Sequence, residues 1–472
     1  MSSKLNVASL FDFDCVDYAK ESNVHLDVVL SAPEREGQKR IPLHLILALD
    51  CSGSMSNGKL DSVKNTVLKL LEHATENDTV GILAFSENVW EVQAPLPMNS
   101  TNRETAKNAV QALHTLGSTN IEDTLIMAIE KAASAAKDQV SRIVLLTDGR
   151  PTCKACDCQR LVGIVAGMTK VVSCSTFGYG TDYDPELLVG LSGAGRGNHF
   201  FIQTDDDCRK AFALELGGLL SLFAQDLKVT LALSGNIAVD EFLSSYEVEQ
   251  SAGYRGITGA KLSFTIPDIY CGEKKHAIIK LKVPQASEAV CSRPTRVCDI
   301  SVEYLDTDSK NKESVSDIVR IQYVKASKLA SEPNKEVREQ LFMIEAAKKQ
   351  AEAKQMADAG NYVEARQVLM TAANWASSSA WHSQSHLVAE NFNTLATSCS
   401  DRVSYQNTGT KHFASYASAY GTARGSSGDT LGMSYTSGIQ LDMLKSFSAT
   451  GTDTENKNKL SLKKDDEEEK KA

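Results

Sequence analysis

The sequence lacks the features that would place it in or across a membrane. No apolar run approaches the roughly 20 residues that a membrane-spanning helix needs, and the best candidate, LGGLLSLFA at 216–224, has about half that length. The first residues, MSSKLNVASLFDFDC, have neither the basic start nor the apolar core of a secretory signal peptide. We therefore expect no membrane span and a cytoplasmic location, where the 11 cysteines are mostly reduced thiols rather than a disulfide framework.

An excess of positive charge is also missing. Lys and Arg number 50 against 60 Asp and Glu, which gives a formal net charge of −10. Nucleic-acid-binding proteins usually present a basic surface, so we expect no nucleic-acid partner. The apolar fraction of 42% is ordinary for a soluble globular protein, and a chain of 472 residues is long enough for roughly two to four domains.

Motifs of common enzyme chemistry are missing as well. The chain has no nucleophile elbow of the type G-x-S-x-G and no carboxylate pair that stands out as an acid/base set. We therefore expect a protein that is not an enzyme.

What the sequence has is a change of pattern along its length. From 41 to 224, apolar strand-like runs alternate with amphipathic helical segments, which predicts an α/β fold with a doubly wound, mostly parallel sheet. IPLHLILALD at 41–50 and SRIVLLTDG at 141–149 are nearly continuous apolar runs, as expected for central strands covered on both faces. From 225 to 328, strands of period two with turn punctuation predict an antiparallel β-sandwich.

Further segments flank these two units. VHLDVVLSAP at 24–33 alternates like a strand, and we expect residues 1–40 to join the sandwich because no helix connects them to the α/β unit. Residues 329–400 predict a C-terminal helical hairpin with a break at Gly360. Residues 401–472 are rich in Ser, Thr and Gly, end in the charged run KKDDEEEKKA, and are predicted to be mostly disordered.

The stretch LILALDCSGSMSNGKLDS at 45–62 allows two interpretations of one turn. Gly53 and Gly58-Lys59 nearly reproduce the phosphate-binding loop G-x-x-x-x-G-K-[ST], and RIVLLTD is similar to the Asp-tipped strand that accompanies such loops. That loop requires a Ser or Thr after its lysine as a Mg²⁺ ligand, and Leu60 stands there instead. The nucleotide interpretation therefore lacks a required ligand.

The same turn suits a hard divalent cation with no part missing. Mg²⁺ takes six oxygen ligands in near-octahedral geometry. Asp50 ends the first apolar strand, and Ser52 and Ser54 follow at alternate positions, so both hydroxyls can point to one side. Asp148 ends another central strand, and Thr119 in LGSTN adds a third hydroxyl. Strand ends of α/β sheets are where ligand sites gather.

These residues carry a resemblance to a known family. LDCSGSM, GSTNIEDTL and LLTDG resemble the three parts of the metal-ion-dependent adhesion site of von Willebrand factor A domains, and FGYGTDYDPELLVGLSGAGRGNHFFI is similar to that family's last strands and helix. The resemblance covers residues 41–224 and implies a doubly wound sheet with Mg²⁺ or Mn²⁺ at its top. It implies Ser52, Ser54 and Thr119 as hydroxyl ligands, and Asp50 and Asp148 as ligands that bind directly or through water.

The resemblance also implies a mode of action. Three neutral hydroxyls and two carboxylates would leave the ion electron-poor, with one position open for a Glu or Asp of a partner protein. That contact is charge-assisted and disappears when the metal is removed. We therefore expect a divalent-metal-dependent protein-binding module or adaptor, with Mg²⁺ or Mn²⁺ as cofactor and a protein partner that presents Asp or Glu.

Two alternatives remain for the function. The order of strand, A domain, sandwich and helical hairpin resembles intracellular multidomain members of the family, some of which carry a RING zinc module and act as ubiquitin ligases. This chain has no eight-ligand Cys/His array, so one alternative is a structural scaffold or adaptor in an intracellular, ubiquitin-related assembly with an incidental metal. The other alternative is an enzyme that uses a nucleotide or a cysteine loop.

The cysteine loop is PTCKACDCQR at 151–160, which places Cys153, Cys156 and Cys158 beside the expected metal face. Three thiols within six residues could hold zinc with a fourth ligand, since C-x-x-C is a common zinc half-site. A second C-x-x-C is absent, and Cys51 could be the fourth ligand only if the fold brings it close. Unpaired reduced thiols are the simpler interpretation, and a zinc or redox role is the alternative.

Overall fold

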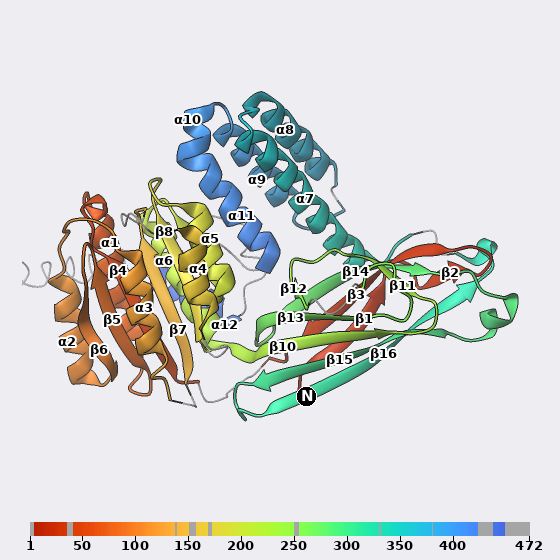
Figure 1. The fold of residues 1–472 in the computed structure, drawn as a ribbon, viewed down its shortest axis with the longest axis horizontal. Coiled ribbons are helices and arrows are strands. Elements are labelled where there is room, and N and C mark those ends of the chain that lie inside the picture. The colour runs from red at the N-terminus through yellow and green to blue at the C-terminus, as the bar shows by residue number, and fades with distance from the viewer. Residues whose placement is uncertain are drawn as a thin grey trace, which may run out of the picture.

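A computed structural model describes residues 4–34, 41–136, 139–150, 157–168, 172–249, 254–329, 332–379, 381–422 and 438–448. It consists of an α/β domain at one end, a β-sandwich at the other, and a helical unit that lies against both (Figure 1). In the described part of the chain, no helix combines the length and the hydropathy needed to cross a bilayer.

The α/β domain is built on a six-stranded sheet with the order β6-β5-β4-β7-β8-β9. Every neighbouring pair is parallel except β5 and β6. The chain moves outward from β4 in one direction and from β7 in the other, so the strand order reverses between these two central strands. The strands are β4 (Leu43–Asp50), β5 (Thr79–Phe85), β6 (Val89–Pro97), β7 (Val140–Thr147), β8 (Val172–Tyr179) and β9 (Arg196–Ile202).

Helices cover both faces of this sheet, which confirms the doubly wound α/β prediction. In β4, Leu45, Leu47 and Leu49 join the core under α1, α2 and α6, while Ile46 and Ala48 join the core under α3, α4 and α5. A strand buried on both faces needs the unbroken apolar run that the sequence shows there. The helices are α1 (Lys59–His73), α2 (Ser100–Gln111), α3 (Ile121–Ala132), α4 (Cys158–Ala166), α5 (Pro185–Ala194) and α6 (Asp205–Leu220).

The β-sandwich has sheets with the orders β1-β3-β14-β11 and β12-β13-β10-β15-β16-β2. All pairs are antiparallel except β16 with β2. The first three strands precede the α/β domain in the chain and the others follow it, so the α/β domain is inserted into the sandwich. The strands are β1 (Asn6–Phe11), β2 (Cys15–Asp17), β3 (Ser22–Ser31), β10 (Leu222–Leu233), β11 (Ala238–Phe242), β12 (Glu247–Val248), β13 (Lys261–Tyr270), β14 (Lys274–Val283), β15 (Thr295–Asp306) and β16 (Lys312–Val324).

A buried ion network joins the two domains. Arg142 of β7 is 1% exposed and lies 3.3 Å from Glu215 of α6 and 3.7 Å from Asp268 of β13. The Ser175 hydroxyl and the Asn198 amide also donate to the Glu215 carboxylate, at 2.6 and 2.8 Å. Buried charges are tolerated only when they are paired and hydrogen-bonded, so this network fixes β7, α6 and the sandwich together.

The helical unit is larger than the hairpin predicted for 329–400. Short 3₁₀ turns η2 and η3 precede it, and a third long helix, α9, packs against α8. Residues 402–422 continue it, with a π-turn η4 between α10 and α11. The two 3₁₀ turns are η2 (Glu288–Ser292), between β14 and β15 of the sandwich, and η3 (Ala326–Lys328), after β16. The elements of the helical unit are α7 (Lys335–Asp358), α8 (Tyr362–Ser378), α9 (Ser385–Ser398), α10 (Arg402–Ser404), η4 (Tyr405–Gly409) and α11 (Thr410–Thr422).

The disorder predicted for 401–472 is therefore wrong at 402–422, and also at 438–448, where α12 (Gly438–Ser448) forms. The reason is that a few aromatic residues supply the buried surface that the average composition does not suggest. Tyr405, Phe413 and Tyr416 enter the core of the helical unit, and Phe447 enters the core of the α/β domain. The rest of 401–472 lies outside the described residues.

Candidate metal centre

The candidate site lies where β4 and β7 end side by side, at the point where the strand order reverses. Asp50 is the last residue of β4, Asp148 follows the last residue of β7, and Ser52 and Ser54 lie in the turn that contains η1 (Gly53–Met55). Such a switch point is the usual ligand site of an open α/β sheet, because the loops diverge there and leave a crevice.

Hydrogen bonds bring the neighbouring loop against this turn. The Leu116 amide donates to the Cys51 carbonyl at 2.6 Å, and the Gly53 amide donates to the Gly117 carbonyl at 3.0 Å. On the other side of Thr119, the Asn120 amide donates to the Ser86 carbonyl at 2.7 Å. The loop that carries Thr119 is thus held at both ends beside the Asp50 turn.

Side-chain contacts link four of the five predicted ligands. The Ser52 amide donates to Asp50 Oδ1 at 2.7 Å, and the Ser52 and Ser54 hydroxyls lie 2.9 Å apart. The Ser54 hydroxyl donates to Asp148 Oδ1 at 2.7 Å. The fifth residue, Thr119, is 4% exposed, and its Oγ1 lies 2.9 Å from the position that a Cβ on Gly149 would take. All five predicted residues therefore meet at the ends of β4 and β7.

The Asp50 and Asp148 carboxylates are both 0% exposed, and for Asp50 burial is the dominant electrostatic effect. It raises the pKa of Asp50 to about 6, and the nearby Asp148 charge acts in the same direction. Hydrogen bonds from the Thr147 hydroxyl, at 2.5 Å, and from Ser52 act in the opposite direction. Ionised Asp50 is therefore short of stabilisation in the protein alone, and a nearby cation would supply it.

Lys59 is a functional residue that sequence reasoning missed. From the sequence, Lys59 is considered only as part of a near phosphate-binding loop, but its ammonium lies 2.5 Å from Asp148 Oδ2. It can reach because Gly58, with φ of 89°, turns the chain into the first residue of α1. The signal was present in the Gly58-Lys59 pair that suggested a phosphate loop.

The donor set fits a hard divalent cation. Two buried carboxylates and three hydroxyls face one ammonium, so the site has oxygen ligands and one uncompensated negative charge when both carboxylates are ionised. Mg²⁺ and Mn²⁺ prefer such oxygen donors. In the described ranges of the chain, no group of three or more His, Cys, Asp or Glu side chains offers a second kind of metal site.

The cysteine loop is described only in part. Cys153 and Cys156 lie outside the described residues, while Cys158 is half-buried as the first residue of α4. Burial raises the pKa of Cys158, and it raises that of the fully buried Cys51 to about 12. Neither environment favours the thiolate that zinc or redox chemistry needs.

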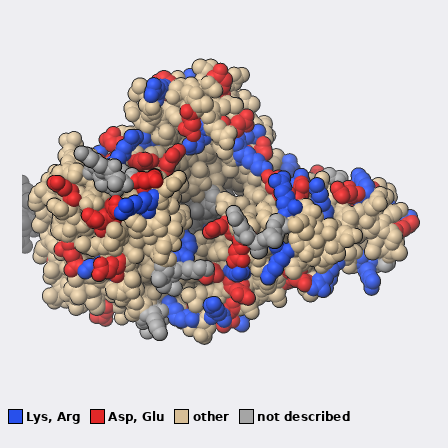
Figure 2. Space-filling model, in the orientation of Figure 1, with Lys and Arg blue, Asp and Glu red and all other residues tan. Residues whose placement is uncertain are grey.

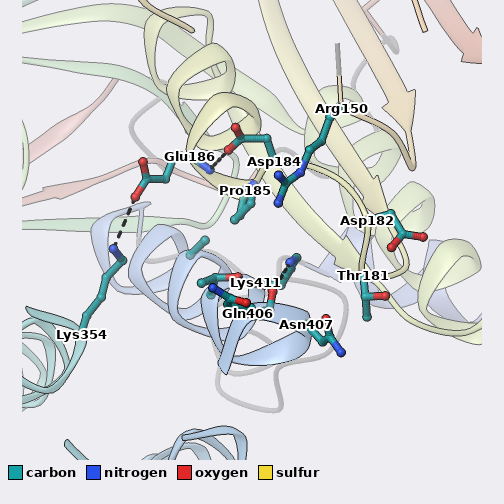
Figure 3. Close-up of a pocket in the computed structure, with 12 residues that line it drawn as sticks. Arg150, Thr181, Asp182, Asp184, Pro185, Glu186, Lys354, Gln406, Asn407 and Lys411 are labelled. Atoms are coloured by element: carbon teal, nitrogen blue, oxygen red, sulfur yellow. Dashed lines mark hydrogen bonds and ion pairs between the residues drawn. The ribbon is translucent and has the colours of Figure 1, made fainter. Parts of the chain in front are cut away.

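A pocket of about 490 Å³ borders the metal face (Figure 3). Arg150 lies two residues after Asp148, and Thr181 follows Gly180, where a Cβ would lie 3.4 Å from Lys59 Nζ. We call this cavity the rim pocket. Its lining includes Arg150, Thr181, Asp182, Asp184 and Glu186 of the α/β domain, and Lys354, Gln406, Asn407 and Lys411 of the helical unit.

Charges of both signs line the rim pocket. Lys354 pairs with Glu186 at 3.5 Å, and the buried Lys411 ammonium donates to the Gln406 carbonyl at 2.7 Å. Burial lowers the pKa of Lys411, and the nearby Arg150 charge lowers it further. Acidic and basic side chains are likewise interspersed over the visible surface, which is hollowed where the three units meet (Figure 2).

Comparisons with known proteins agree with this architecture. Residues 44–212 match the von Willebrand factor type A domain family. A von Willebrand factor type A protein from Catenulispora acidiphila has the same fold, with a TM-score of 0.63 and 17% identity over 81% of this chain and 88% of that chain. The ArnB paralog VWA2 from Sulfolobus acidocaldarius has a TM-score of 0.55 and 16% identity over 89% of this chain and all of its own (100%).

Curated relatives match over a smaller share of their own length. An uncharacterized protein of Synechocystis sp. is 29% identical over 41% of this chain and 46% of its own length. The E3 ubiquitin-protein ligase WAVH1 of Arabidopsis thaliana is 23% identical over 59% of this chain and 37% of its own length. The matched part of this chain thus spans less than half the length of these relatives.

Proposed function

We propose that the protein is a non-enzymatic binding module that recognises an acidic side chain of a partner protein through a divalent cation. The premise is that residues 44–212 of this chain form a von Willebrand factor type A domain. The observation that supports this most is the convergence of two buried carboxylates and three hydroxyls at the switch point between β4 and β7. Binding domains of this class act through sites rather than through the fold as a whole.

Each residue of the centre has a separate task in this proposal. Ser52, Ser54 and Thr119 would hold Mg²⁺ or Mn²⁺ together with Asp50 and Asp148, and such an ion supplies a Lewis-acidic position for one further oxygen ligand. Lys59 compensates one of the two buried carboxylates and holds Asp148 in place. The neutral hydroxyls add no charge, so the centre retains affinity for an incoming carboxylate.

A calorimetric titration with Mg²⁺ tests the centre without requiring a known partner. We expect Asp50→Ala to abolish binding and Ser52→Ala to weaken it at least about tenfold, because each removes an oxygen donor. Ser56→Ala is the matched control, since it removes a hydroxyl from the same turn but not from the donor set. Circular dichroism should show that all three variants keep the fold. Unchanged Mg²⁺ affinity in Ser52→Ala would show that the site is misassigned.

A second candidate function is an adaptor in a ubiquitin-related assembly. It is favoured by two relatives named as E3 ubiquitin-protein ligases, WAVH1 and WAV3 of Arabidopsis thaliana, whose matches each cover 59% of this chain and so extend beyond the A domain. In this case the sandwich and helical unit would carry the contacts, and the metal would be incidental.

Affinity capture with and without EDTA separates the two candidates. Capture that fails in EDTA and returns with Mg²⁺ supports metal-dependent recognition, whereas EDTA-insensitive capture supports the adaptor. Fractionation of the source cells tests the cytoplasmic location, which stays a prediction of the sequence.

A further inference from the structure

The rim pocket contains a buried cation, the ammonium group of Lys411 in α11. The Lys411 side chain is 1% exposed. Among the described residues, its ammonium has one hydrogen-bond partner, the Gln406 carbonyl at 2.7 Å, and no ion-pair partner. Burial lowers the pKa of Lys411, because the charged form lacks stabilisation there. A buried charge is costly unless an opposite charge compensates it, so this cation favours the arrival of an anion.

Arg150 brings a second positive charge to the same cavity from the α/β domain. Its side chain is exposed and has no ion-pair partner in the described part of the chain. Figure 3 shows that Arg150 and Lys411 extend into the rim pocket from opposite sides. The Arg150 charge is close enough to lower the pKa of Lys411 further. An anion that enters between the two cations would relieve this repulsion.

The acidic side chains of the pocket have other roles. Glu186 pairs with Lys354 at 3.5 Å. Asp184 caps α5, since its Oδ1 accepts from two backbone amides at 3.0 and 3.2 Å. Asp182 and Asp184 attract the Lys411 charge from a distance, but this effect is smaller than that of burial. Within the described residues, no carboxylate forms an ion pair with either cation of the pocket.

The rim pocket begins next to the proposed metal centre. Arg150 follows Asp148 by two residues, so their Cα atoms are at most about 7.6 Å apart. Lys59, which pairs with Asp148, lies 3.4 Å from the Cβ position of Gly180, the residue before Thr181 of the pocket. An extended peptide rises about 3.3 Å per residue, so side chains two to four residues apart span about 7–13 Å. One partner segment can therefore reach both places.

The size of the cavity favours a peptide over an isolated ion. Its volume of about 490 Å³ falls within the roughly 300–1,000 Å³ that is typical of pockets for organic ligands. Its lining also includes the hydroxyl and amide side chains of Thr181, Gln406, Asn407 and Thr410, which can hydrogen-bond to peptide groups. The cavity can therefore take an acidic side chain together with its neighbours.

We propose that the rim pocket is a second recognition site, in which Arg150 binds another acidic side chain of the same partner segment and the Lys411 charge stabilises it. The protein then reads a pair of acidic residues two to four positions apart, one at the metal and one in the pocket. This inference rests on the proposed metal-dependent recognition and adds the sequence pattern of the partner. Because the two cations belong to different units, the bound segment also bridges the α/β domain and the helical unit.

Synthetic peptides of glycine and serine, blocked at both ends, test the second site in the full chain with Mg²⁺ present. One set carries two Asp residues at spacings of two to four positions, and a reference peptide has Asn in place of the second Asp. Ligand-detected nuclear magnetic resonance measures such weak binding. We expect the best two-Asp peptide to bind the wild type about tenfold more tightly than its reference.

The two proposals fail in different ways in this experiment. Equal affinity of the two-Asp and reference peptides at every spacing would overturn the second site and leave the metal centre standing. Binding that survives EDTA, or no binding of any peptide, would overturn the proposed function and the second site with it.

Arg150→Gln and Lys411→Met locate the gain in affinity. Both variants should lose the gain from the second Asp, while the affinity for the reference peptide stays as in the wild type. Arg366→Gln is the matched control, because it removes a positive charge from an exposed position of α8 that does not line the pocket. If Arg366→Gln loses as much of the gain as Arg150→Gln, the effect is general charge attraction and the inference fails.

Chemical denaturation distinguishes a binding lysine from a structural one. If the Lys411 ammonium served only to hold the Gln406 carbonyl in η4, its removal would lower the urea midpoint. We expect Lys411→Met to keep or raise the midpoint, because methionine fills a similar volume without a buried charge. A lower midpoint would overturn the inference.

Inorganic phosphate tests whether the ligand is a free anion. We expect no saturable phosphate binding in EDTA, because the pocket is larger than a single ion needs. Saturable binding that Lys411→Met abolishes would assign the pocket to a free anion and would overturn the assignment to a partner segment.

Discussion

Gly149→Ala should impair metal binding although Gly149 is not a ligand. A Cβ at this position would lie 2.9 Å from Thr119 Oγ1 and 3.4 Å from Thr119 Cγ2. Ordinary contacts between carbon atoms lie at about 3.5–4.0 Å, so the two side chains cannot both keep their places. The Thr119 loop is held by hydrogen bonds of Gly117 and Asn120 to neighbouring segments, so we expect the Thr119 side chain, rather than its backbone, to shift from its place in the donor set.

The size of the effect follows from the number of ligands. Thr119 is one of three hydroxyls in the proposed donor set, and groups that orient a metal ligand typically change affinity by about 10–100-fold when removed. We therefore expect Mg²⁺ to bind Gly149→Ala about 10–100-fold more weakly, which corresponds to roughly 1.4–2.8 kcal/mol. Isothermal calorimetry measures this loss, and the urea midpoint without metal shows whether the fold is intact.

Gly163→Ala provides a matched control with the same chemical change. Gly163 lies inside α4, and nothing would lie within 4 Å of its Cβ. This variant should bind Mg²⁺ as the wild type does and gain up to about 1 kcal/mol of stability, because alanine favours a helix interior. Wild-type Mg²⁺ affinity in a folded Gly149→Ala protein would refute the assignment of Thr119.

Two further predictions concern stability. Burial lowers the pKa of His199 to about 3 and of His412 to about 4, so the folded protein holds both imidazoles neutral while the unfolded chain takes up protons. The contribution of the two neutral histidines to the free energy of unfolding should therefore be fully present above about pH 6.5. Below that pH it should fall by about 1.4 kcal/mol per pH unit for each histidine. Urea titrations of His199→Gln should show a shallower fall with pH. Arg142→Met should cost about 3–5 kcal/mol, because Glu215 and Asp268 would remain buried with less compensation, and Glu215→Gln in the same chain should restore part of the loss in chemical denaturation.

The sequence predicted those parts of the molecule whose structure depends mainly on residues close together in the chain. The apolar runs that became β4 and β7 identified central strands, and Asp50 and Asp148 at their ends identified the candidate site. The order of strands could not be predicted this way, because it depends on pairing between distant segments. The structure adds that β4 and β7 are adjacent, which explains why two carboxylates almost 100 residues apart share one crevice.

Other features depended on single side chains, whose effect the average composition of a segment does not show. Lys59 lies in a motif that lacks the hydroxyl a phosphate-binding loop needs, with Leu60 in its place, so the sequence alone does not predict its contact with Asp148. The segments at 402–422 and 438–448 lie in a region rich in Ser, Thr and Gly, and a few side chains such as Phe413, Leu444 and Phe447 pack them into a core. Composition predicts how much surface a segment can bury on average, but not whether a single aromatic side chain packs into the core of another unit.

The insertion of the α/β domain into the sandwich has a consequence in time. Strand β3 pairs with β14 through contacts such as Ser31 with Lys274, so its partner is made 243 residues later (274 − 31). A ribosome adds roughly 5–20 residues per second, which leaves β3 without that partner for roughly 10–50 s during synthesis. Throughout that interval Leu26, Val28 and Leu30 of β3, which the finished sandwich buries, lack the later strands of the sandwich core. The domain that carries the metal centre can fold meanwhile, and the sandwich closes around its connections afterwards.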